Sequence, residues 1–289
     1  MKPTKWPILG ALAFLGMAAL LRFWIAPLLE RLPANYAAEV ELSEDNQFRD
    51  SPTGEWQAST LKARRVDQII TNSGQTAIIE GALHVYYASG EVNFEVTGLY
   101  GIDRRTRQNL AGYGDVNRTG QYLFPPHVKR IDYPIWDPMF VGPRQATFER
   151  TEKIDGLQVY VFSFNATGMD ESAGYSYLPD VPENYLAHTD GEGTIWVEPL
   201  SGIVMDYEDS GVSYFVIPST RVRLADFNQW EERYTPETRT TQIKLARAAR
   251  LRILLLEVYL PAASLLAGLI WLVGVGTKHR GFLKRKSDE

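Results

Sequence analysis

Two short clusters of carboxylates come closest to a metal-binding pattern in this sequence. Asp190 and Glu192 lie in TDGEGTIW, and Asp206, Glu208 and Asp209 lie in MDYEDSG. Calcium takes several oxygen ligands at short spacing, so either cluster could bind it weakly. Acidic β-turns have the same composition, and we interpret both clusters as turns. We expect neither a metal site nor a cofactor.

The histidines form no catalytic pattern. His84 lies in a strand-like stretch, His127 follows two prolines, His188 lies in a polar segment and His279 lies near the C-terminus. The sequence contains no H-x-x-x-H, G-x-S-x-G or glycine-rich phosphate loop. It also contains no cysteine, which excludes thiol catalysis and disulfides. We therefore expect a protein that is not an enzyme.

The stretch IDYPIWDP, residues 131–138, is dense in carboxylates, prolines and aromatic side chains. Proline pushes the residue before it towards an extended conformation, and Tyr and Trp combine a large apolar area with a hydrogen-bonding tip. We predict a packed corner between two strands rather than an active site. The structural residues predicted for this corner are Asp132, Tyr133, Trp136 and Asp137. The expected charge partners of its two aspartates are Lys129, Arg130 and Arg144.

Two apolar segments frame the chain. Residues 6–29 are interrupted only by Arg22, and residues 253–276 only by Glu257. Each is long enough to cross a hydrocarbon core of about 30 Å as a helix. The alternatives are a cleaved signal peptide for the first and a buried helix for the second. Because charges in a membrane are costly and tend to pair, we predict an Arg22–Glu257 contact; the alternative is that each side chain reaches the outer interface separately.

Charge sorting indicates how the chain is placed. Residues 33–238 carry 16 Lys/Arg and 31 Asp/Glu, a net charge of −15, whereas the remainder has a net charge of +10. Lys2 and Lys5 precede the first apolar segment, and a basic tail follows the second, which predicts cytoplasmic termini and an extracytoplasmic main domain. The second apolar segment also has basic residues on its other side, so the difference in basic residues between its two sides is small. These residues are Lys244, Arg247, Arg250 and Arg252. An acidic body excludes nucleic acid as a partner.

The middle of the chain is predicted to be mainly β, forming a large antiparallel sandwich or barrel-like domain. β-Branched and aromatic residues are concentrated in five stretches that turn-forming pairs separate, among them Ser210-Gly211. The stretch LQVYVFSF is apolar on both faces, which indicates a central strand covered on both sides. The predicted strands are 76–89, 91–102, 157–166, 194–199 and 203–209.

A helix is predicted to begin near residue 236. Thr235 is suited to the N-cap, Pro236 to the first helical position and Glu237 to the first turn. The helix should then continue into the membrane. The expected organisation is therefore 1–5 cytoplasmic, 6–29 transmembrane, 30–235 extracytoplasmic and β-rich, 236–252 stalk helix, 253–276 transmembrane and 277–289 basic cytoplasmic tail.

Five separated blocks resemble one bacterial family. The blocks are GLYGIDRRTRQ (98–108), GYGD (112–115), GQYLFPPHVKRIDYPIWDP (120–138), EKIDGLQVYVFSF (152–164) and IWVEPLSGIVMDYED (195–209). In this order they are similar to the porin PorA family. The resemblance implies one helix at each end and a β-rich extracytoplasmic domain between them, and it supplies no catalytic residues.

These observations predict an envelope protein of the bacterial cell membrane that binds, and carries or senses, a lipid or another amphiphile. Membrane lipid is the expected partner, with other envelope proteins or further copies of the chain as additional ones. Two alternatives stay open: a docking or scaffolding subunit of an envelope membrane-protein complex, and a component of an oligomeric channel, as the family name suggests. An internal apolar tunnel would favour the carrier, and an exposed apolar patch would favour the scaffold.

Overall fold

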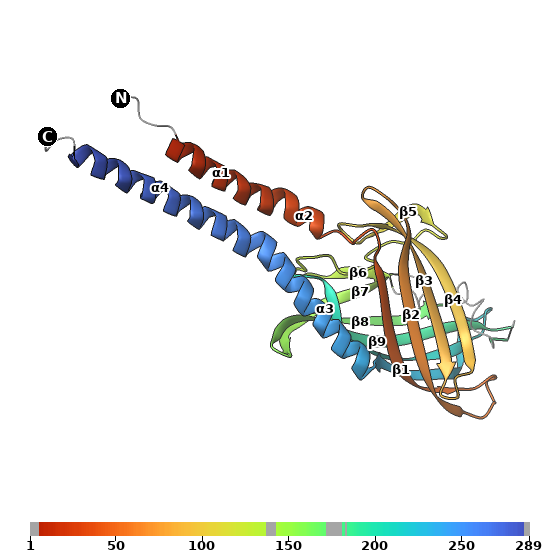
Figure 1. The fold of residues 1–289 in the computed structure, drawn as a ribbon. Coiled ribbons are helices and arrows are strands. Elements are labelled where there is room, and N and C mark those ends of the chain that lie inside the picture. The colour runs from red at the N-terminus through yellow and green to blue at the C-terminus, as the bar shows by residue number, and fades with distance from the viewer. Residues whose placement is uncertain (1–5, 137–142, 172–180, 183, 286–289) are drawn as a thin grey trace. The chain divides into compact units, whose positions relative to one another are not determined.

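The chain was analysed as a computed structural model that describes residues 6–136, 143–171, 181–182 and 184–285. It divides into two compact units. The helical unit comprises Met1–Arg31 and Ala248–Glu289, and the β unit comprises Leu32–Arg247. Figure 1 shows the helices and strands of both units, coloured from the N-terminus to the C-terminus.

The described residues of the β unit form one antiparallel sheet of eleven strands, which confirms the predicted mainly β class. The strand order is β5-β4-β3-β2-β1-β11-β10-β9-β8-β7-β6. Only the β1–β11 pairing joins strands far apart in sequence; the other neighbours follow one another along the chain. The strands are β1 (Ala37–Phe48), β2 (Gln57–Ser73), β3 (Thr76–Tyr87), β4 (Val92–Asp103), β5 (Asn109–Gly114), β6 (Tyr133–Trp136), β7 (Pro143–Ile154), β8 (Leu157–Asp170), β9 (Leu186–Glu198), β10 (Ile203–Val216) and β11 (Arg223–Tyr234).

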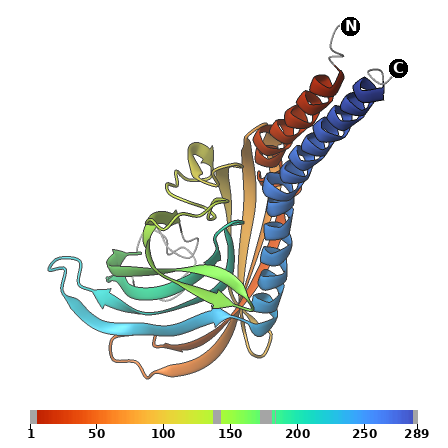
Figure 2. The ribbon, with the colours of Figure 1, turned by 90° about the vertical axis from the view of Figure 1, so that its left-hand side faces the viewer.

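The sheet is strongly curled, as Figure 2 shows. Its two edge strands, β5 and β6, are bridged by Gln121. The backbone N–H of Gln121 donates to Pro134 O at 2.6 Å and its carbonyl accepts from Trp136 N at 2.8 Å, while Asn109 N donates to Gly120 O at 2.9 Å. A short segment around Gln121 therefore completes a ring of strands at this position.

Glycines allow aromatic side chains to lie flat on the curled sheet. A Cβ added to Gly211 would collide with the indole ring of Trp230, its cross-strand partner. A Cβ added to Gly193 would collide with the ring of Phe164, which is also its cross-strand partner. Glycine in a strand weakens it locally but permits bending and close approach, which a curled sheet needs.

Different parts of the chain pack on the two faces of the sheet. On the inner face, Phe162, Phe164 and Ile195 pack against Phe124 and Tyr133 from the segment that precedes β7. The outer face of β7–β10 is covered by α3 (Pro236–Leu254). Ile243 and Ala246 of this helix pack on three buried side chains of that face, namely Ile154, Val159 and Met205. β8 is thus covered on both sides, as its sequence predicts.

α3 begins at Pro236, where the sequence predicts a helix start. The side-chain oxygen of Thr235 accepts a hydrogen bond from Thr238 N at 3.2 Å, which satisfies one of the free N–H groups of the first turn. The helix continues through a π-helical turn, η3 (Leu255–Tyr259), into α4 (Leu260–Arg285).

The helical unit pairs two long apolar helices. The first consists of α1 (Trp6–Leu20), a π-helical turn η1 (Leu21–Ile25) and α2 (Ala26–Leu29). Its Gly10 lies against Trp271 of α4, and Ser264 Oγ donates to Phe14 O at 2.9 Å. Small residues that permit close approach, together with an interhelical hydrogen bond, are typical of membrane helix pairs. Ile8–Leu29 and Pro236–Val275 are long and apolar enough to cross a membrane.

The structure corrects two expectations about turns. Residues 189–193, interpreted as an acidic turn, lie inside β9, and Ser210-Gly211 lies inside β10. Instead of forming a turn, Gly191 and Gly211 lie against Trp230, and Gly193 lies against Phe164. The strands β1, β2 and β11 were not among the stretches that the sequence singled out, because polar and charged residues alternate along all three.

Candidate functional site

Three carboxylates form one row across the inner face of the β unit. Glu44 on β1 lies directly opposite Glu232 on β11, and Glu232 lies directly opposite Asp209 on β10. Their exposed fractions are only 8%, 7% and 6%, respectively. Directly opposed side chains on antiparallel strands have Cβ atoms about 5 Å apart, and like charges at this separation are destabilising. Acidic side chains are rarely buried to this extent unless other groups compensate their charge.

Glu44 retains a short polar connection within the row. Asn46 Nδ2 donates to Glu44 Oε1 at 2.7 Å and to Asn228 Oδ1 at 2.8 Å. Burial raises the pKa of the Glu44 carboxyl above its ordinary value, although the hydrogen bond from Asn46 opposes this. This direction favours the protonated form of Glu44.

A buried arginine lies at the β8 end of the same face. Asp209 is opposite Gly193, and Gly193 is opposite Phe164. The guanidinium of Arg144 lies 4.7 Å from the centre of the Phe164 ring, and Arg144 is 3% exposed. Because Gly193 has no side chain, the Phe164 ring lies over its backbone, and the Arg144 guanidinium packs on that ring.

Glu171 adds a further buried carboxyl. Its side chain is hydrogen-bonded to Thr189, which also shares a 2.7 Å hydrogen bond with Ser213. Burial raises the pKa of Glu171 to about 7, while the bond to Thr189 and the charge of Arg144 act in the opposite direction. This carboxyl therefore titrates close to neutral pH.

The inner face changes character on β2 and β3. Leu61 and Ala63 of β2 and Leu83 and Val85 of β3 are buried there together with Leu42 of β1. Since Glu44 and Leu42 are alternate residues of one strand, the boundary between ionisable and apolar surface runs along β1. Among the described residues, an apolar patch on β1–β3 thus lies beside the acidic row, while Arg65 and Asp67 of β2 share the same face.

A half-buried arginine on β2, Arg65, is held by protein groups. Arg65 Nε donates to Asp67 Oδ1 at 3.0 Å, and its Nη2 donates to the Tyr122 hydroxyl at 3.1 Å. Its guanidinium also lies 6.0 Å from the Tyr100 ring centre. Burial raises the pKa of the nearby Tyr36 to about 12, so its hydroxyl stays neutral. These contacts of Arg65 therefore tie β2 to the segment around Tyr122 and have a structural role.

The residues predicted for the corner at 131–138 lie in and beside an edge strand. Tyr133 and Trp136 belong to β6, so a strand replaces the predicted corner, and Asp137 lies outside the described residues. The Tyr133 hydroxyl accepts from Lys129 N at 2.9 Å. Asp132 accepts from Phe148 N at 3.3 Å, whereas Arg144 lies over Phe164.

The two carboxylate clusters considered for calcium have protein partners. Asp190 accepts from the Tyr214 hydroxyl at 3.1 Å and from Gly168 N at 2.7 Å, and it forms an ion pair with Arg223. Asp206 forms an ion pair with Arg239 at 2.7 Å. These carboxylates therefore tie strands, and a strand to α3, together.

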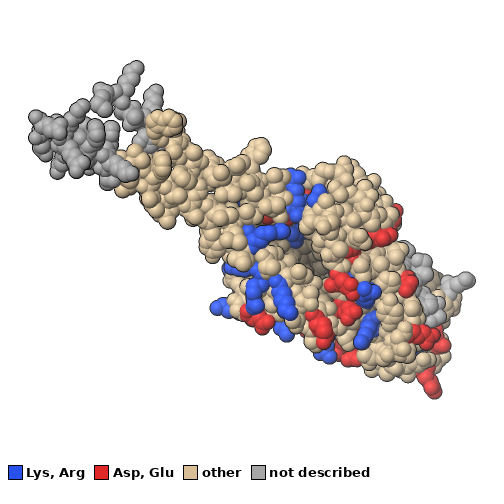
Figure 3. All heavy atoms as spheres, viewed as in Figure 1, with Lys and Arg blue, Asp and Glu red and all other residues tan. Residues whose placement is uncertain are grey.

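The outer face also carries carboxylates around a hollow of about 530 Å³. Its acidic lining includes Asp45, Glu192, Glu208 and Glu231, with Arg233 beside them. In the view of Figure 3, Asp and Glu side chains are visible on the surface of the β unit. This distribution agrees with the acidic charge of the middle segment.

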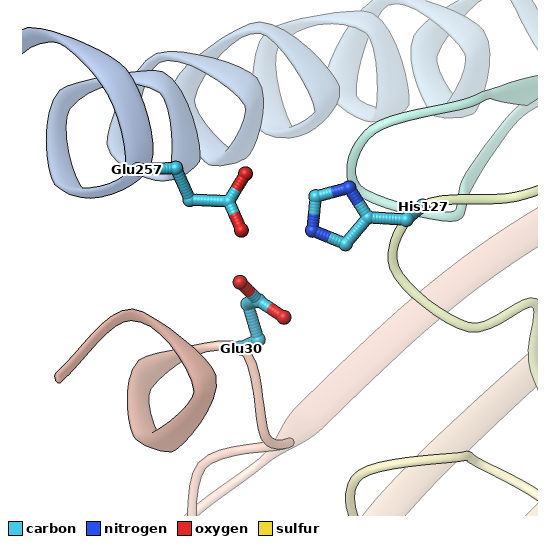
Figure 4. A group of neighbouring side chains, drawn as sticks. All are labelled: Glu30, His127 and Glu257. Atoms are coloured by element: carbon cyan, nitrogen blue, oxygen red, sulfur yellow. The ribbon is translucent and has the colours of Figure 1, made fainter. Parts of the chain in front are cut away.

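The predicted Arg22–Glu257 contact is present in the helical unit. Arg22 Nη1 lies 2.5 Å from Glu257 Oε1, and each residue belongs to a π-helical turn, η1 or η3. The carboxylate of Glu30 faces that of Glu257 in Figure 4, where His127 of the β unit is also drawn. Arg252 Nη2 donates to Leu29 O at 3.0 Å nearby. Sequence reasoning missed the π turns, because no residue pattern marks them.

The family comparison matches almost the whole chain. The model described as porin PorA matches residues 8–276, from the first apolar helix to the end of the second. The chain belongs to the porin PorA family. Family membership and the two apolar helices together indicate association with a membrane. Among curated proteins, none matches this PorA-family chain.

Two solved structures show a distant likeness to this PorA-family chain. The structure of DynF from the dynemicin biosynthesis pathway of Micromonospora chersina has 10% identity and a TM-score of 0.18, covering 72% of this chain and 85% of that one. A LolA superfamily protein, NE2245 from Nitrosomonas europaea, has 12% identity and a TM-score of 0.14, covering 78% and 91%. At these TM-scores neither likeness bears on function.

Proposed function

We propose that this PorA-family chain is a membrane-anchored binding protein that holds an amphiphile, such as a lipid, on the inner face of its β unit. The observation that carries the proposal is an apolar patch that lies directly beside buried carboxyl groups on that face. Leu61, Leu83 and Val85 supply an apolar side, and Glu44 and Glu232 belong to a buried ionisable row. An amphiphile has the same two-part character.

Energetics support binding over simple packing. A sheet that only needs a core fills its inner face with apolar side chains, because burying a charge without compensation costs several kcal/mol. Glu44, Glu232 and Asp209 instead place three buried carboxyl groups on three successive strands of that face.

The rest of the proposal concerns placement and chemistry. The basic residues that flank the two apolar helices support cytoplasmic termini and an extracytoplasmic β unit. Among the described residues, the inner face offers carboxylates and arginines without an arrangement of nucleophile and base, which supports binding over catalysis.

The first test uses the full chain and a photoreactive C16 fatty acid carrying a diazirine. After irradiation and digestion, the labelled peptides are identified by mass spectrometry. We expect label on β2–β4, β10 and β11. Label confined to residues 6–29 and 253–276 would refute the proposal, since that pattern reports only lipid around the helices.

A matched pair of variants tests the ionisable row. Glu232→Gln removes an inner-face charge with little change in shape, while Glu231→Gln removes the adjacent exposed charge on the outer face. We expect Glu232→Gln to change inner-face labelling severalfold and Glu231→Gln to leave it unchanged. Equal labelling in both variants would leave the carboxylates without a role in binding.

The alternative of a docking or scaffolding subunit predicts a different result. It requires cross-links from the β unit to other envelope proteins and no labelling of the inner face. The channel alternative requires conductance that depends on association of several copies, measurable in a planar bilayer.

A further inference from the structure

The helical unit contains an apolar groove of about 420 Å³ between α1 and α4. Its walls are two stripes with helical spacing, one on each helix. α1 contributes Ile8, Ala11, Leu12 and Leu15, and α4 contributes Leu265, Gly268, Leu269 and Leu272, with Phe14 at the contact between them.

The groove exists because small residues stand beside a tight helix contact. On the contact side, Gly10 meets Trp271 and Gly268 meets Phe14, which brings the helix backbones close. On the groove side, Ala11 and Gly268 leave a hollow that larger side chains would fill. The leucines along the rims are about half exposed, with Leu12 at 55% and Leu269 at 58%.

The position of the groove selects its occupant. Both helices qualify as membrane spans, so hydrocarbon is the medium around them. The seven helical steps from Ile8 to Leu15 correspond to a rise of roughly 10 Å, about a third of the hydrocarbon thickness. Trp6, 75% exposed, lies two residues before Ile8, and an exposed tryptophan at a helix end is typical of the headgroup level.

Basic residues that flank the two helices in the sequence favour an anionic headgroup. The chain continues from Trp6 into Lys5 and Lys2, and beyond Leu272 it reaches Lys278 and Arg280. The two helices are antiparallel neighbours, so Trp6 and Leu272 lie toward the same end of the unit, and the basic residues follow beyond them in the sequence. Basic residues directly after a membrane span attract anionic lipids, by about 1 kcal/mol each.

We propose that this groove holds one acyl chain of an anionic phospholipid, with the headgroup at the Trp6 end of the groove. The site is separate from the inner face of the β unit and stands independently of its function. Van der Waals packing against the groove walls holds the chain in place, because the hydrophobic effect gives no preference for the groove over bulk lipid. Charge then discriminates between headgroups.

The test is native mass spectrometry of the full chain released from detergent containing equal amounts of phosphatidylglycerol and phosphatidylcholine. We expect one retained phosphatidylglycerol per chain. Ala11→Phe fills the groove and should reduce retention at least fivefold, whereas Ala13→Phe, at an exposed position outside the groove lining, should not. Equal loss in both variants, or no retained lipid in the unaltered chain, overturns the proposal.

Two further measurements guard against misfolding and an alternative occupant. Leu269→Ala shortens one wall without adding bulk, and it should also lower retention while the purified variant stays monodisperse. Replacing Lys2 and Lys5 by Gln should lower the preference for phosphatidylglycerol over phosphatidylcholine by about tenfold or more. Cross-linking through Leu12 to a second copy in place of lipid would overturn the proposal.

Discussion

Glu171 should make the stability of the β unit fall as pH rises through neutrality. Its carboxyl is 7% exposed, and burial raises its pKa to about 7 from an ordinary value of 4.5. In the unfolded chain this carboxyl ionises near pH 4.5, whereas in the folded chain it keeps its proton until about pH 7. The folded state therefore binds more protons in this window, and stability is lost as pH increases.

The size of the effect follows from the shift. Each pKa unit corresponds to 1.36 kcal/mol, so a shift from 4.5 to about 7 contributes about 3 kcal/mol to the free energy of unfolding below pH 4.5. The contribution declines by roughly 1.4 kcal/mol per pH unit and is gone above pH 7. Glu44, whose pKa is also raised by burial, acts in the same direction.

The assay compares variants to isolate Glu171 from Glu44. Urea unfolding of the full chain in detergent is followed by tryptophan fluorescence between pH 5 and pH 8. Glu171→Gln stays neutral and retains a group that can bond to Thr189, so its loss of stability across this range should be smaller than that of the unaltered chain by about 3 kcal/mol. Glu192→Gln, at an exposed position of β9, is the matched control and should change nothing.

The reasoning is refuted if the unaltered chain and Glu171→Gln show parallel pH profiles. It is also refuted if the unaltered chain gains stability from pH 5 to pH 7 relative to Glu171→Gln. That sign would mean that the folded state stabilises the charged carboxylate, with Arg144 outweighing burial.

Three further perturbations test other parts of the structure. Arg22→Ala and Glu257→Ala should each lower the amount of folded protein in the membrane, and exchanging the two residues should restore it; absence of rescue in a Western blot of membranes would contradict the pairing. Gly193→Val should destabilise the β unit by about 1–3 kcal/mol through overpacking against Phe164, measured by urea unfolding. Thr235→Ala should cost about 1 kcal/mol through loss of the bond to Thr238 N, and an unchanged unfolding midpoint would show that water replaces the cap.

Local patterns in the sequence predicted the mainly β class, the central position of β8 and the start of α3. Each depends on residues close together in the chain, such as Thr235, Pro236 and Glu237 for the helix start. Intramembrane charge alone was enough to predict the Arg22–Glu257 contact, because two opposite charges in apolar helices have few other solutions.

The inner-face row could not be predicted in the same way. Glu44 and Glu232 meet only because β1 pairs with β11, and no local pattern specifies that closure. One signal was available in the sequence. Glu44 follows Leu42 at a spacing of two, so a carboxylate occupies the register of buried residues, and the same spacing relates Glu232 to Tyr234. Alternation of this kind is a reason to examine acidic residues within strands.

The bridge at Gln121 gives the β unit one weak place in its circumference. Neighbouring strands elsewhere are joined along ladders such as the one from Ala37 to Phe48, whereas β5 and β6 are joined through the few backbone hydrogen bonds around a single residue. Breaking those bonds costs less than unzipping a long ladder such as β1–β2. We therefore expect the ring to open first at this seam, with the long ladders intact, so that the domain acts as a clasp rather than a closed tube.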